Sequence, residues 1–140
     1  MPDIKTPAAN ATMSVASTAL RAQQARMRII AENLANANSI SRTPGGEPYR
    51  RQIPVFAAVK SDGAEGVQMA KGEADQSDFK VDYEPGHPSA DAQGYVKLPN
   101  VDPLVEALDM REAQRAYEAN LNVIETTRAM QMRTLDLLKK

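Results

Sequence analysis

The chain has 140 residues and a formal net charge of −1, which predicts one small domain with extended arms and argues against a nucleic-acid partner, since that would need a basic surface. It contains no cysteine, so disulfides, thiolate metal sites and cysteine catalysis are excluded. Its apolar runs are short and Met1–Met13 lacks the basic and apolar regions of a secretion signal, so we expect neither a transmembrane segment nor a cleaved signal peptide.

The sequence of residues 1–38 predicts a flexible segment followed by a helix. Residues 1–12 are rich in Pro, Ala, Asn and Thr without periodicity, which is typical of a flexible segment. From Met13 onward, apolar residues recur at alternating steps of three and four, with Gln23 as the one polar member of the row. Gln23 either fixes the helix register or is tolerated by chance. We expect an N-terminal axial helix over residues 13–38 that fades at its asparagine-rich end.

The middle of the chain, residues 39–100, predicts a loop followed by a small β-rich module. Thr43–Pro48 is dense in turn-forming residues. Short runs of β-branched and aromatic residues predict strands within Tyr49–Lys60, Val67–Ala70, Phe79–Tyr83 and Tyr95–Leu98. In the first of these, the side chains expected to be buried are Ile53, Val55, Phe56 and Val59, and Pro54 indicates an edge strand.

The C-terminal part, residues 101–140, predicts one uninterrupted axial helix of about 36 residues, too long for an ordinary globular helix. Asp102 is the expected N-cap, Pro103 occupies the first helical position, and neither Gly nor Pro occurs afterwards. Two neighbouring apolar rows run along this helix, so we expect it to need more than one neighbour. The predicted fold is mainly α with a small β-rich insert, and its long terminal helices pair in coiled-coil fashion.

Side chains that could carry chemistry are few. His87 is the only histidine, and it lies in a Pro-Gly-His-Pro turn, so we favour a structural role over a metal or catalytic role. Arg50-Arg51 is the notable basic pair outside the helices; we read it as a solvated strand start, with a charge pair to a partner subunit as the alternative. We therefore expect no enzyme activity, catalytic residue, metal, cofactor or small-molecule substrate.

Several stretches resemble the axial proteins of the bacterial flagellar rod and hook. They are residues 22–38, which contain Asn33-Leu34-Ala35-Asn36, and then 45–51, 83–88, 94–102 and 115–120. The resemblance extends over nearly the whole chain, and the Pro-Gly-His-Pro turn, the Pro-Asn-Val-Asp junction and the short length are similar to the proximal rod subunits. Residues 75–79 and 106–110 depart from the family pattern.

This resemblance implies a structural subunit of the proximal rod, located in the periplasm and exported by the flagellar type III apparatus without a cleaved signal. Its partners would be other rod proteins, copies of itself and the adaptor at the membrane ring. The alternative is a small helical adaptor that binds one partner helix. The expected assembly interface consists of Met13, Leu20, Met27, Ile30, Leu34, Ala113, Ala116, Tyr117, Asn120, Leu121, Val123, Ile124, Met130, Leu135 and Leu138.

Overall fold

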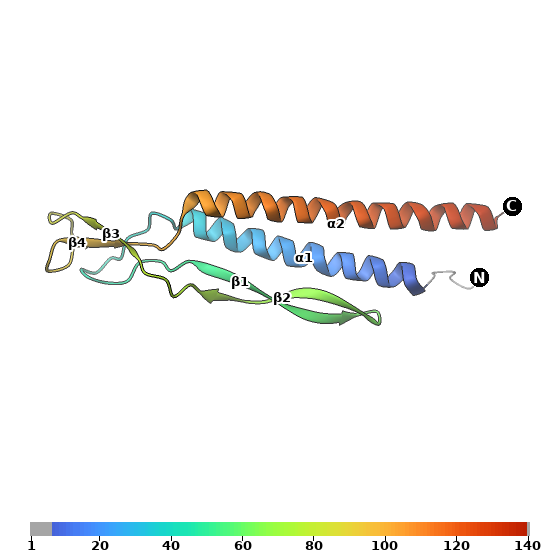
Figure 1. Ribbon diagram of the computed structural model, residues 1–140, viewed down its shortest axis with the longest axis horizontal. Helices are drawn as coiled ribbons and strands as arrows, with labels where there is room; N and C mark the ends of the chain where they lie inside the picture. The colour runs from blue at the N-terminus through green and yellow to red at the C-terminus, as the bar shows by residue number, and fades with distance from the viewer. Residues whose placement is uncertain (1–6, 140) are drawn as a thin grey trace. The chain divides into compact units, whose positions relative to one another are not determined.

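The computed structural model describes residues 7–139, in which a long helix precedes four strands in the chain and a second long helix follows them (Figure 1). In chain order the elements are α1 (Pro7–Ala35), β1 (Gln52–Ser61), β2 (Ala64–Ala74), β3 (Lys80–Tyr83), β4 (Tyr95–Leu98) and α2 (Pro103–Leu138). The prediction of two long helices with a small β-rich insert is confirmed. Neither helix within residues 7–139 has an apolar stretch of the length that crossing a membrane requires.

Helix α1 begins at Pro7 and not at Met13, so the prediction of a flexible segment was wrong for residues 7–12. Residues 1–6, the rest of that segment, lie outside the described residues. The earlier start has a local cause, because proline suits the first helical position and the following alanines have the highest helix propensity. The end at Ala35 agrees with the predicted fading: the Asn36 backbone and side-chain amides both donate to the Glu32 carbonyl, and a turn follows.

Helix α2 begins as the sequence predicts. The Asp102 carboxylate accepts a hydrogen bond from the Leu104 amide at 3.0 Å, and the Asp102 carbonyl accepts one from the Glu106 amide at 3.0 Å. Asp102 is therefore the N-cap. Proline is suited to position 103 because a backbone N–H in the first turn would have no acceptor within the helix, so the missing N–H costs no hydrogen bond. The helix then continues without interruption to Leu138.

The strands form two separate hairpins, β1–β2 and β3–β4. Asp62 and Gly63 join β1 to β2, and both have positive φ angles, 49° and 80°, as a two-residue hairpin turn requires. Strand β2 is longer than the predicted Val67–Ala70, and it pairs with β1. Ile53 and Phe56 are 36% and 39% exposed, so the prediction that they are buried was wrong. The physical reason is that β1 belongs to a two-stranded ribbon, which lacks the second packed layer of a full sheet.

The chain divides into two compact units, each of which contains part of both helices. The first, here called the helical unit, consists of α1 up to Arg26, Phe56–Ala70 and α2 from Glu112. The second, here called the loop-rich unit, consists of Met27–Val55 and Lys71–Arg111.

In the helical unit, α1 and α2 run antiparallel and pack through small residues. Arg26 pairs with Glu112 at 3.6 Å, whereas Asn10 and Gln131 line one common groove. Among the described residues of this unit, the buried apolar side chains are those of Ala16, Ala22 and Ala113. Alanines allow the backbones to approach closely, but they bury little apolar surface, so this unit has a thin core.

The same unit also places β2 directly against α1. The Thr18 hydroxyl accepts a hydrogen bond from the Val67 amide at 3.2 Å. A Cβ atom on Gly66 would collide with the Thr18 side chain. Only glycine therefore permits this approach of strand to helix without a shift of either element.

The core of the loop-rich unit combines branched aliphatic side chains with buried polar ones. Its buried apolar residues are Ile29, Ile30, Val96 and Val101, and its buried polar residues are Asn33 and Glu106. Strands β3 and β4 pair antiparallel, with Tyr83 opposite Tyr95. Their rings meet edge to face with centroids 5.3 Å apart, a favourable aromatic geometry.

Candidate assembly surfaces and a buried polar cluster

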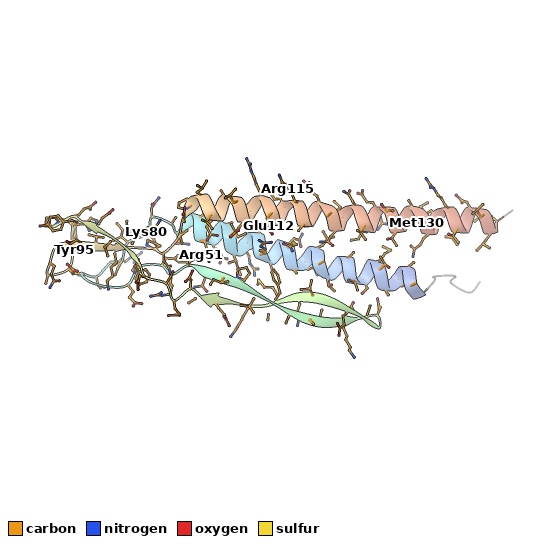
Figure 2. All side chains as sticks on the ribbon, in the orientation of Figure 1. Arg51, Lys80, Tyr95, Glu112, Arg115 and Met130 are labelled. Atoms are coloured by element: carbon orange, nitrogen blue, oxygen red, sulfur yellow. The ribbon has the colours of Figure 1, made fainter. Side chains whose placement is uncertain are left out.

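The C-terminal half of α2 exposes large apolar side chains on more than one side of the helix, and they are here together called the α2 face. Met130 is 62% exposed, Leu137 73% and Leu138 60%, and Met130 is labelled in Figure 2. Its members in the helical unit are Leu121, Val123, Met130, Met132, Leu135, Leu137 and Leu138. Exposed apolar surface costs about 25 cal/mol per Å² relative to burial, and contiguous patches of it mark interaction sites.

The structure separates the predicted interface residues into three groups. Ile30 and Ala113 are 2% and 0% exposed, so their assignment to an intermolecular surface was wrong. Their positions in the apolar rows serve packing within the chain instead. The exposed members are Leu121, Val123, Met130, Leu135 and Leu138, and the half-buried ones are Met13, Leu20, Met27, Leu34, Ala116, Tyr117, Asn120 and Ile124.

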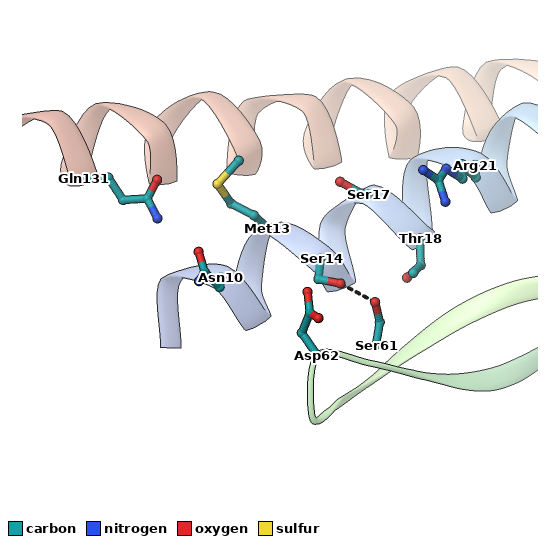
Figure 3. A pocket seen from close by; sticks show the side chains of 9 residues that line it. All are labelled: Asn10, Met13, Ser14, Ser17, Thr18, Arg21, Ser61, Asp62 and Gln131. Carbon is teal, nitrogen blue, oxygen red and sulfur yellow. Dashed lines mark hydrogen bonds between the residues drawn. The ribbon is translucent and has the colours of Figure 1, made fainter. Parts of the chain in front are cut away.

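Two hollows lie between the helices of the helical unit. The smaller, of about 340 Å³, is lined by Ala11, Thr12, Val15, Ala16, Ala64, Asn120 and Val123. The larger, of about 910 Å³, is open and mostly polar; Figure 3 shows its lining side chains, which include Ser14, Ser61, Asp62 and Gln131. Ser14 and Ser61 are joined there by a hydrogen bond, which connects α1 to the end of β1. The two hollows show that α1 and α2 do not pack closely along their whole length, which agrees with the exposure of apolar side chains on α2.

Asn33 lies at the centre of a buried polar cluster in the loop-rich unit. Its side-chain oxygen accepts hydrogen bonds from the Tyr49 hydroxyl at 2.7 Å and from the Gln52 amide at 2.9 Å. Its side-chain nitrogen donates to the Gln52 carbonyl at 2.9 Å and to Glu106 Oε2 at 3.4 Å. The amide thus uses both donors and both lone pairs, and it joins α1, β1 and α2.

Arg51 supplies the positive charge of this cluster (Figure 2). Its guanidinium donates to the buried Glu106 carboxylate and lies 3.4 Å from Asp75 Oδ2 and 3.6 Å from Asp109 Oδ2. Burial acts to lower the pKa of Arg51, but the hydrogen bonds and charges of Glu106 and Asp75 outweigh it and raise that pKa. Burial, together with the charges of Glu32 and Glu106, also raises the pKa of Tyr49. Arg51 therefore remains charged and Tyr49 remains a hydrogen-bond donor.

The neighbouring Arg50 fixes the segment after β2. It donates to the carbonyls of Asp75 and Ser77 at 2.7 and 3.0 Å, and its guanidinium lies 4.2 Å from the centre of the Phe79 ring. The prediction that Arg50-Arg51 is a solvated strand start was therefore wrong. Both arginines bind partners within the chain. Their carboxylate and carbonyl partners lie in segments that are distant in the sequence, so the sequence alone does not show them.

The sequence contains one signal for this cluster. Glu106 and Asp109 continue, by steps of three and four, the row that holds Ala113 and Ala116. Acidic residues in an otherwise apolar row need a cation, and Arg51 belongs to the notable basic pair outside the helices. Asn33 gave no comparable signal, because its four partners become visible only in the fold.

His87 lies half-buried in the turn between β3 and β4, where its Nδ1 accepts a hydrogen bond from the Ser89 amide at 3.0 Å. Within residues 7–139 there is no group of three or more His, Cys, Asp or Glu side chains that could hold a metal ion.

Two family matches cover the ends of the chain. Residues 13–39 match the family described as flagella basal body rod protein, and residues 92–137 match flagellar basal body rod FlgEFG protein C-terminal. The first match contains the Asn33 motif, and the second contains Glu106 and the α2 face up to Leu137.

Individual relatives extend the similarity to nearly the full length. The chain is 46% identical over 132 residues to the flagellar basal-body rod protein FlgC of Agrobacterium fabrum, covering 93% of this chain and 95% of the relative. It is 44% identical over 125 residues to FlgC of Escherichia coli O6:H1, covering 88% and 92%. It is 35% identical over 145 residues to FlgC of Bacillus subtilis, covering 91% and 97%. The chain therefore belongs to the FlgC family of flagellar basal-body rod proteins, which are structural subunits of the basal body.

Proposed function

We propose that this chain is a subunit of the proximal part of the rod and that it assembles through its terminal helices into the drive-shaft tube that motility requires. The α2 face is the observation that carries this proposal, since Met130, Leu137 and Leu138 are left in water by the single chain. Burying such a face against neighbouring subunits supplies a driving force of about 25 cal/mol per Å².

The two units differ in how they are packed, and this difference supports an assembly role. In the helical unit, the packing through Ala16, Ala22 and Ala113 leaves the large side chains of α2 available. In the loop-rich unit, Asn33, Arg51 and Glu106 tie both helices to the strands. We infer that this cluster fixes the structure of the loop-rich unit, whereas the helical unit completes its burial, in coiled-coil fashion, against other subunits.

The proposed interface consists of the predicted residues without Ile30 and Ala113, which the chain itself buries. In terms of domains, residues 13–38 and 101–140 would be the axial helices, and residues 39–100 the loop and β-rich module between them. Residues 7–12 extend the first axial helix.

The proposed partners are other rod proteins, copies of this chain and the adaptor between rod and membrane ring. The proposed location is the rod within the periplasm, reached through the flagellar type III apparatus without a cleaved signal. Relatives named as basal-body rod proteins, 46% and 44% identical over most of their length, support this placement. Those names describe structural proteins, which supports a role without enzyme activity.

Purification of intact basal bodies tests the proposal. We expect the chain to co-fractionate with the rod and, in isolation, to be monomeric or to form open-ended assemblies. A chain that is missing from basal bodies and forms a defined dimer in solution would instead identify a small helical adaptor.

A further inference from the structure

The turn between β3 and β4 contains a contact that depends on the protonation of one side chain. The amide N–H of Ser89 donates to Nδ1 of His87 at 3.0 Å. A backbone N–H can only donate, so Nδ1 must carry a lone pair and not a proton. The imidazole is therefore neutral at this nitrogen whenever the contact is made.

Ser89 also connects this turn to the loop of residues 39–48. Its hydroxyl donates to the Ser41 carbonyl at 2.6 Å, and its carbonyl accepts from the Gly45 amide at 3.4 Å. The loop adds hydrogen bonds of its own between Ser41 and Thr43 and between Gly46 and Thr43. Ser89 therefore provides the hydrogen bonds that attach the loop to the turn.

We propose that His87 is a proton-controlled clasp that, through Ser89, holds the 39–48 loop against the β3–β4 turn. When the imidazole is neutral, Nδ1 fixes the Ser89 amide and so orients the hydroxyl and carbonyl of the same residue toward the loop. When the imidazole is protonated, both ring nitrogens carry hydrogens and the Ser89 amide loses its acceptor. The loop is then released from the turn.

The surroundings of the clasp contain few other groups that can change charge. The charged residues are Glu84 and Asp91 in the turn and Arg42 and Glu47 in the loop. The Asp91 carboxylate already accepts the amides of Gln93 and Tyr95, both at 2.9 Å. His87 is the single histidine of the chain, so a change in protection between pH 5 and 7.5 that His87→Asn abolishes is assigned to the imidazole.

Amide exchange measured by NMR on the full-length monomer, corrected for the intrinsic effect of pH, tests the clasp. One hydrogen bond is worth about 1 kcal/mol, so we expect protection of the Ser89 amide to fall about fivefold between pH 7.5 and pH 5, with Gly45 following it. The Gly94 amide, which donates to the Asp91 carbonyl at 3.0 Å, serves as an internal reference that should not change.

Two variants separate the clasp from a merely structural turn. In His87→Asn, the side-chain oxygen can accept the amide two residues on at every pH, so protection should persist and lose its pH dependence. In His87→Ala, protection at Ser89 and Gly45 should be low at both pH values. A wild-type chain without pH dependence at Ser89, or an equal dependence in His87→Asn, would overturn the proposal.

Discussion

The side-chain nitrogen of Asn33 lies 3.4 Å from Oε2 of Glu106, and both residues are almost completely buried. These residues come from different helices, and the amide places a donor beside a carboxylate whose other oxygen is bound by Arg51. The pair therefore sets how the ends of α1 and α2 meet in the loop-rich unit. An apolar contact could bring two helices together, but it would not fix their register in this way.

Asn33→Asp should destabilise the fold although it hardly changes the shape of the side chain. The new carboxylate would face Glu106 as a second negative charge, and the Gln52 carbonyl would lose its donor. We expect a loss of at least about 2 kcal/mol in the free energy of unfolding, measured with urea. Asn36→Asp is the matched control, because that amide is bonded only to an exposed carbonyl in the last turn. Equal losses in both variants would show that the Asn33 cluster has no special role.

Acidification should weaken the fold through Asp75. The pKa of its carboxyl is lowered, chiefly by the hydrogen bond from the Ser77 amide, then by the Ser77 side chain and by Arg51. Because this pKa lies below its unfolded value of about 4, Asp75 contributes stability above that pH, which is lost as the pH falls through the folded pKa. We therefore expect the midpoint of urea unfolding to fall between pH 5 and pH 3, and to fall less in Asp75→Asn. An exposed substitution, Asp78→Asn, should leave the wild-type pH dependence unchanged.

Hydrogen exchange in an isolated chain should differ strongly along α2. The segment around Glu106 and Ala113 is packed, whereas the segment from Met130 to Leu138 exposes its apolar side chains. Helices without a packed face are only marginally stable in water. We expect amides beyond Met130 to exchange at least about tenfold faster than those near Glu106. Uniformly strong protection to Leu138 in a verified monomer would contradict this.

The sequence was most informative where the cause of structure is local. The cap at Asp102, the absence of Gly and Pro afterwards and the two apolar rows predict one uninterrupted helix within residues 101–140, and α2 runs from Pro103 to Leu138. The composition of residues 7–12, rich in Pro and Ala, predicts flexibility, but these residues form the start of α1. In fact Pro7 suits the first helical position, and alanine is the best helix former.

The polar cluster depends on residues that the fold brings together. Asn33, Arg51 and Glu106 are distant in the sequence, and their hydrogen bonds follow from tertiary structure. An apolar row also does not tell whether its members pack within the chain or between chains. Ala113 and Met130 belong to the same row, yet the first is fully buried and the second is exposed.

The most direct test of the α2 face compares how well two variants of this chain are incorporated into the rod. Met130→Asp and Ala129→Asp introduce the same charge at neighbouring exposed positions, so both should leave the isolated fold intact. Met130 belongs to the α2 face, whereas Ala129 does not and points about 100° away from Met130 around the helix. In a strain that lacks its own copy of the gene, immunoblots of purified basal bodies should show Ala129→Asp at the wild-type level and Met130→Asp reduced at least about tenfold. Equal incorporation of the two variants would show that the α2 face is not an assembly interface.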